Sequence, residues 1–78
     1  MIIFNHNEQS FKVDAETHFY TKATILFGRD NPAKNGYELY GVGSEDFLIA
    51  TFESFYEAFD TYQKIMIGLK NEWKVFYI

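Results

Sequence analysis

The sequence predicts a single α+β domain: an antiparallel meander of five to six strands, with one amphipathic helix on one face and a C-terminal strand. Three observations support this class. Short apolar or alternating segments separated by turn residues fill the first two thirds of the chain, one capped helical pattern follows, and an apolar segment comes last. No proline- or glycine-rich linker interrupts these segments, so we expect residues 1–78 to form one small domain.

The first part of the chain alternates short strands with turns. Residues 1–4 are apolar, residues 11–15 alternate with period two, and the polar residues 5–10 between them predict a hairpin turn. A longer strand is predicted from about Phe19 to Gly28. Its two faces would carry Phe19, Thr21, Ala23, Ile25 and Phe27 on one side and Tyr20, Lys22, Thr24 and Leu26 on the other.

Two further strands are predicted in the middle of the chain. Residues 30–36 contain Asn-Pro and Asn-Gly, which are both strong turn signals. Residues 37–42 would then return as the partner of the long strand. A second turn at residues 43–46 leads to a strand at residues 47–52, and the simplest arrangement of these segments is an antiparallel meander.

The helix is the clearest local prediction. Ser54 and Glu57 match a capping box, and Asp60 and Lys64 stand four residues apart on the side predicted to face water. Residues 70–71 suit the C-terminal end. The predicted buried stripe, spaced by three and four residues, is Phe55, Phe59, Tyr62, Met66 and Leu69.

A final strand is predicted at residues 73–78, and we expect it to join the sheet because an unpaired apolar strand would fray or aggregate. One helix covers only one face of a sheet. The apolar residues that exceed what one face can hold are Tyr20, Leu26, Tyr40, Trp73 and Phe76. We therefore expect aromatic surface outside the core, at a dimer interface or a partner site.

The composition excludes several classes of protein. With no cysteine, the chain has no disulfide, no thiolate metal site and no cysteine nucleophile. Eleven acidic residues against seven Lys and Arg give a net charge of −4, which is not the basic footprint of a nucleic-acid binder. A domain this small has a marginal core, so the 21% aromatic content predicts either a dense aromatic core or a partner subunit.

No motif predicts an enzyme or a bound cofactor. The serines lack a nucleophile-elbow motif, and Glu45 and Asp46 lie in a predicted turn rather than in a cleft. The residues of a conceivable weak metal site are His6, Glu8, Asp14 and His18. Their spacing matches no known ligand set, so a solvated hairpin turn is the favoured interpretation.

The sequence also lacks the signals of secretion or membrane insertion. Its first residues have no basic segment followed by a long apolar one, and its apolar runs are far shorter than the roughly 20 residues that span a bilayer. We expect a cytoplasmic protein with no membrane partner.

Residues 48–58, Leu-Ile-Ala-Thr-Phe-Glu-Ser-Phe-Tyr-Glu-Ala, followed by Tyr62 and Ile65, resemble a small α+β protein family of Firmicutes and their phages. Members of that family have a short apolar strand, a polar turn, a second strand, a meander and one helix. The resemblance implies the fold and the origin, and it carries no activity and no catalytic residue. Residues with AT-rich codons make up 35 of the 78 positions, which agrees with a low-GC bacterial or phage genome.

These observations predict a small non-enzymatic binding protein, encoded by a phage or mobile element, that occludes another protein such as a host target. Large aromatic side chains supply much of the binding energy of interfaces. The predicted contact residues are Tyr20, Tyr37, Tyr40, Trp73 and Tyr77. Two alternatives remain open: a structural homodimer, and a single-stranded nucleic-acid binder that stacks bases on sheet aromatics.

Overall fold

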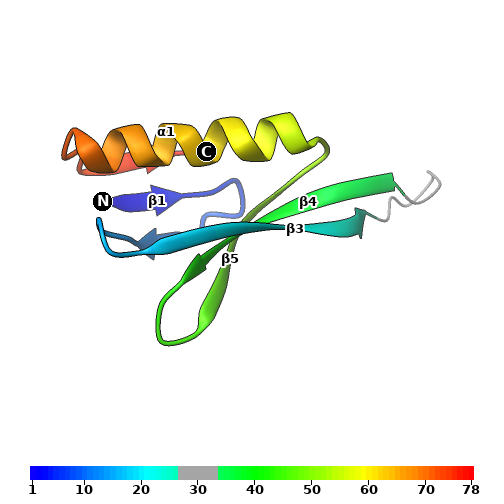
Figure 1. Ribbon diagram of the computed structural model, residues 1–78, viewed down its shortest axis with the longest axis horizontal. Coiled ribbons are helices and arrows are strands. Elements are labelled where there is room, and N and C mark those ends of the chain that lie inside the picture. Colours follow the sequence, from blue (N-terminus) through cyan, green and yellow to red (C-terminus); the bar gives the residue numbers. More distant parts are fainter. Residues whose placement is uncertain (27–33) are drawn as a thin grey trace.

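The computed structural model describes residues 1–26 and 34–78 and confirms the α+β class (Figure 1). The elements, in chain order, are β1 (Ile2–Phe4), β2 (Ser10–Lys12), β3 (His18–Leu26), β4 (Lys34–Val42), β5 (Asp46–Phe52), α1 (Phe55–Lys70) and β6 (Val75–Tyr77). The predicted hairpin of β1 and β2, the long strand β3 and the single helix are all present. The predicted Phe27, Gly28 and most of the following turn lie outside the described residues.

The strands form two three-stranded sheets instead of one continuous meander. One sheet has the order β3-β4-β5 and is antiparallel throughout, as predicted. The other has the order β2-β1-β6, in which β6 runs parallel to β1. A parallel pair needs a long crossover, and here all the elements between β1 and β6, α1 included, supply it. Local sequence patterns cannot reveal a pairing between the two ends of the chain.

The Asn-Gly dipeptide at residues 35–36 lies inside β4, which corrects the predicted turn there. Gly36 pairs with Thr24 of β3, and the side chain of Leu26 lies across it. A Cβ atom at Gly36 would lie 2.5 Å from Leu26 Cγ, so this position needs glycine for close packing between strands rather than for a turn.

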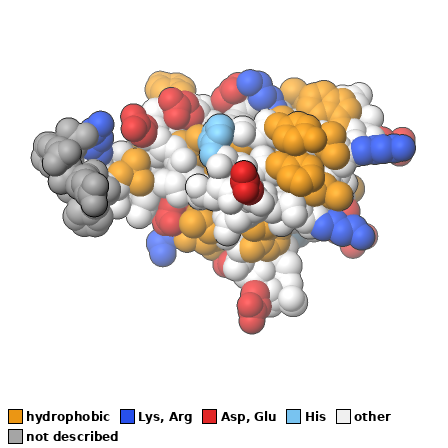
Figure 2. All heavy atoms as spheres, turned by 180° about the vertical axis from the view of Figure 1, so that it is seen from behind, with side chains coloured by type: hydrophobic (Ala, Val, Ile, Leu, Met, Phe, Trp, Pro, Cys, Tyr) orange, Lys and Arg blue, Asp and Glu red, His pale blue; other side chains and the backbone are white. Residues whose placement is uncertain are grey.

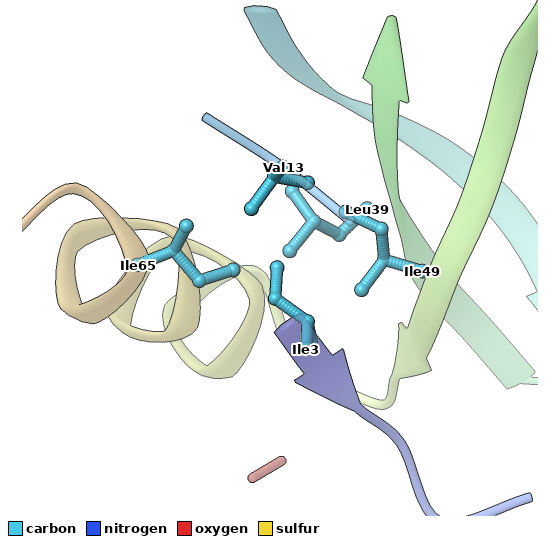
Figure 3. Packing of buried hydrophobic residues seen from close by; sticks show 5 residues of the cluster. All are labelled: Ile3, Val13, Leu39, Ile49 and Ile65. Atoms are coloured by element: carbon cyan, nitrogen blue, oxygen red, sulfur yellow. The ribbon is translucent and has the colours of Figure 1, made fainter. Parts of the chain in front are cut away.

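One core holds both sheets and the helix together (Figure 3). Its five buried aliphatic residues come from β1, the segment after β2, β4, β5 and α1, and they are Ile3, Val13, Leu39, Ile49 and Ile65. Burial of each such side chain stabilises the fold by about 1.5–3 kcal/mol. Because each residue comes from a different segment, no pair of neighbouring elements contains the core on its own.

The buried face of α1 differs from the predicted stripe. Its fully buried residues are Ala58, Ile65 and Gly68, while Phe55, Phe59 and Met66 of the predicted stripe are 45%, 42% and 39% exposed. At 100° per residue, the centre of these three buried residues lies roughly 90° around the helix from the centre of the predicted stripe. The physical reason is close approach, since small residues on this face let Ile65 reach the centre of the core.

The helix ends as the sequence predicts. The Ser54 hydroxyl accepts a hydrogen bond from the Glu57 backbone N–H at 3.2 Å, which confirms the N-cap. Lys64 and Asp60 form an exposed ion pair at 2.9 Å. At the C-terminal end, the side chain and backbone N–H of Asn71 both donate to the Ile67 carbonyl.

A bulge in β5 connects the two sheets. Leu39 pairs with Ala50 and Tyr40 pairs with Leu48, so Ile49 is an extra residue that faces no partner on β4. The side-chain amide of Asn5, in the turn after β1, donates to the Ile49 carbonyl at 2.7 Å. The same side chain accepts hydrogen bonds from two backbone N–H groups of its own turn. Asn5 therefore orders the first hairpin and attaches it to the other sheet.

We predict that Asn5→Ala lowers the free energy of unfolding by about 1–3 kcal/mol, because it leaves the Ile49 carbonyl and two turn amides without their partner. Urea unfolding followed by circular dichroism measures this change. Asn5→Asp keeps the acceptor of the turn but places a carboxylate oxygen against the Ile49 carbonyl, so it should also lower stability. Asn7→Ala, in the same exposed turn, is the control and should change stability by less than about 0.5 kcal/mol. Equal losses at Asn5 and Asn7 would contradict the assignment.

Candidate functional site

The five predicted contact residues lie on different parts of the surface. Tyr20 and Tyr40 are cross-strand partners on the face of β3-β4-β5 that points away from the core, because Leu39, the neighbour of Tyr40, points into it. Their rings stack at 5.1 Å with an interplanar angle of 8°. The Tyr20 hydroxyl donates to Asp46 at 2.7 Å and the Tyr40 hydroxyl donates to Glu38 at 3.2 Å.

Tyr77 lies on the outer face of the other sheet, where it is 71% exposed and stacks on Phe4 at 5.1 Å. The register places Ile2 and Val75 beside them on the same face, 41% and 44% exposed. We call these four residues the β1–β6 patch. In the view from behind, apolar side chains gather at one end of the molecule, toward the right (Figure 2).

Trp73 closes the C-terminal end of α1. Glu72 adopts a left-handed backbone with a φ of 58°, and the Trp73 N–H donates to the Gly68 carbonyl at 2.8 Å. The Trp73 ring stacks on Phe76 at 6.4 Å and lies against Gly68, where an added Cβ would come within 2.6 Å of it. This ring is 43% exposed, but its contacts give it a structural role.

Tyr37 belongs to a row of aromatic rings between α1 and the sheet. Its ring meets the edge of Phe55 at 5.8 Å, and Phe55 stacks on Phe59 at 5.7 Å. The row continues from Phe59 to Tyr62 at 6.2 Å and from Tyr62 to Phe19 of β3 at 6.1 Å. Four of these rings, all except Tyr37, border a groove of about 250 Å³ between α1 and β3, which we call the α1–β3 groove.

The backbone of β3 forms one wall of the α1–β3 groove. Phe19, Tyr20 and Thr21 all line it, although the side chains of successive strand residues point to opposite faces. The Tyr20 ring is stacked on the far face, so this residue meets the groove through its main chain. The opposite wall comes from Phe55, Phe59 and Tyr62 of α1, with Leu39 at the base.

The chemistry of the α1–β3 groove is apolar. None of the described residues that line it carries a charge. In the described part of the chain, every buried side-chain nitrogen or oxygen has a hydrogen-bond partner. Half-exposed aromatic rings beside such a hollow fit apolar side chains of a ligand rather than a reacting group.

Sequence analysis missed Phe55 and Phe59 as surface residues because it assigned them to the core. A signal for them existed in the width of the apolar pattern on α1. Ala58 and Ile65, added to the predicted stripe, give an apolar face broader than a core alone requires.

The residues of the conceivable metal site do not come together in the described structure. Within residues 1–26 and 34–78, no three His, Asp or Glu side chains come close enough to hold a metal ion. A second hollow of about 200 Å³, between the turn after β1 and β5, includes His6 in its lining. None of the described helices has both the length and the apolar character needed to cross a membrane.

Comparison of this chain with protein-family models, with curated proteins and with solved structures finds no match. The resemblance to a family of Firmicutes and phages therefore remains a prediction.

The stacked tyrosines give a prediction about titration. The hydrogen bond to Asp46 is the main cause that raises the pKa of Tyr20 from 10.0 to about 12, because it stabilises the neutral phenol. Partial burial, followed by the charge of Glu38, raises the pKa of Tyr40. Both groups favour the folded state fully below pH 10, and the contribution of Tyr20 is lost as the pH rises from about 10 to about 12.

We expect Asp46→Asn to lower the pKa of Tyr20 toward 10.0, measured by the ultraviolet absorbance of the phenolate, with Tyr20→Phe to identify the signal. Asp60→Asn is the matched control, because it removes one carboxylate whose bonded partner is Lys64 on α1. A pKa of Tyr20 that stays unchanged in Asp46→Asn would contradict the assigned hydrogen bond.

Proposed function

We propose that this chain is a small, non-enzymatic, cytoplasmic binding protein of phage or mobile-element origin, which occludes a surface of another protein. The observation that carries the proposal is the exposure of Phe55 and Phe59, at 45% and 42%, beside the α1–β3 groove. These rings are not needed to close the core, and aromatic side chains around an apolar hollow are typical anchors of protein interfaces.

Tyr37 is the predicted contact residue that belongs to this surface, since it touches Phe55 at one end of the aromatic row. Tyr20 borders the groove with its main chain. Trp73, Tyr40 and Tyr77 lie elsewhere, so one partner bound in the groove would not need all five residues.

Single-stranded nucleic acid is less well supported. The Tyr20 and Tyr40 rings lie on the outer sheet face, where bases would stack, but their hydroxyls are bonded to Asp46 and Glu38. Two carboxylates beside the stacking surface repel phosphate groups. The acidic net charge of −4 acts in the same direction.

Phe59→Ala should abolish capture of the partner, because it removes the ring at the centre of the aromatic row. The measurement is a tagged pull-down from a low-GC Gram-positive lysate, treated with nuclease, followed by the dissociation constant of the purified pair. We expect a loss of at least about tenfold in affinity, which corresponds to 1.4 kcal/mol.

Ile67→Ala is the matched control, because Ile67 is a large apolar residue on the same helix, 52% exposed and absent from the groove lining. Circular dichroism should show both variants folded. Equal capture by Phe59→Ala and Ile67→Ala would refute a role for the groove, and capture that disappears with nuclease would favour the nucleic-acid alternative.

A homodimer is the second candidate, favoured by the β1–β6 patch. We predict that the protein self-associates through this patch and that Tyr77→Lys shifts sedimentation equilibrium toward the monomer, since it places a charge among Ile2, Phe4 and Val75. Phe59→Ala should leave self-association unchanged. A monomeric wild-type protein would contradict this second candidate and leave the first intact.

A further inference from the structure

We propose that the ligand of the α1–β3 groove is an extended segment of the partner protein, which adds as a further strand to the free edge of β3. The inference rests on the proposed function and specifies its ligand. Main-chain hydrogen bonds to β3 would supply affinity, and alternate side chains of the segment would enter the groove.

β3 is an edge strand with one side unpaired among the described strands. β3 pairs with β4 over its whole length, from His18↔Val42 to Leu26↔Lys34, and lies at the edge of its sheet. On the side away from β4, alternate N–H and C=O groups of its nine residues have no strand partner among the described residues. Such a row is a template for another strand. Its described sequence contains no proline that would interrupt it.

The opposite edge of this sheet is different. At β5 the bulge at Ile49 breaks the regular spacing, and the Asn5 side chain donates to the Ile49 carbonyl. The turn after β1 lies against the same strand, since Asn5, His6 and residues 48–51 line one hollow. Bulges and covering segments are the usual means by which proteins protect an edge. β3 is therefore the more available edge.

The α1–β3 groove lies beside this free edge. A strand added to β3 lies about 4.8 Å from it, directly against the wall formed by the β3 backbone. Every second side chain of that strand would point to the same face as Phe19 and Thr21, beneath the rings of Phe55 and Phe59. The geometry thus predicts apolar ligand residues with a period of two rather than the three-and-four spacing of a helix.

The charge of Lys22 on β3 favours a different protein, rather than a second copy of this chain, as the occupant of the groove. Lys22 is the central residue of β3 and points to the face away from the groove. Glu38 of β4 lies opposite it in the register, on the side away from the free edge, and the two form no ion pair. An acidic residue of the ligand directly opposite Lys22 would stabilise the pair of strands. Two copies of β3 paired about their centre would instead bring the two Lys22 side chains together, which is unfavourable.

The experiment selects binders from a displayed library of random nine-residue peptides against the full chain. We expect the enriched peptides to carry apolar residues at alternate positions and an acidic residue between them. Lys22→Glu should change the preference at that intervening position from acidic to basic. Phe59→Ala should weaken binding of the best peptide by at least about tenfold, while Ile67→Ala leaves its affinity unchanged.

Backbone methylation tests strand addition itself. Two versions of the best peptide carry N-methyl groups on alternate residues, one on the odd and one on the even positions. We expect one version to lose binding, because its methylated amides face β3, and the other to bind as before. Hydrogen exchange should show new protection at alternate amides of β3.

Equal binding of both methylated peptides, enrichment with helical spacing, or no enrichment would overturn the inference. A protein captured in a Phe59-dependent manner would still support the proposed function in any of these cases. Self-association that is lost in Phe59→Ala would also overturn the inference, because it would make a second copy the occupant.

Discussion

The position of Ile65 is the constraint on which the rest of the molecule depends. This side chain is fully buried where α1 meets Ile3 of one sheet and Leu39 and Ile49 of the other. Two sheets of three strands each have little stability of their own until they pack against another element. The helix must therefore turn its small residues and Ile65 inward, and this rotation carries the larger ring of Phe59 to the side, above β3. The exposed aromatic row is a geometric consequence of how the core closes.

Local features were predictable from the sequence because local physics determines them. Period-two alternation correctly separates Phe19 and Thr21 from Tyr20 and Lys22, and the Ser54 cap places the start of the helix. The parallel pairing of β1 with β6 was not predictable, because it joins the two ends of the chain. The buried face of α1 was misjudged for a related reason. Several rotations of a broad apolar face satisfy the sequence, and only the tertiary fit selects one.

The sequence predicted that the candidate site would consist of exposed aromatic rings, but it did not predict which rings or where they lie. Counting aromatic residues correctly indicated that some rings would remain outside the core, and several are more than a third exposed. Composition cannot distinguish Trp73, which closes the end of α1, from Phe59, which has no comparable structural task. Nor can it show that Tyr20 and Tyr40 have their hydroxyls bonded to carboxylates. Those assignments depend on hydrogen bonds and stacking between residues far apart in the sequence.

The two exposed apolar surfaces differ in what they offer a partner. The β1–β6 patch lies on short strands and presents side chains with a limited length of backbone, so it suits a flat and symmetric contact. The α1–β3 groove combines rings with a nine-residue edge. Rings alone would bind many apolar surfaces with little discrimination, whereas an edge accepts only an extended chain. Lys22 at the centre of that edge adds a charge that disfavours a second copy. The free edge of β3, the rings of the groove and the charge of Lys22 together favour one kind of proposed ligand. It is an extended segment with apolar residues at alternate positions and an acidic residue between them.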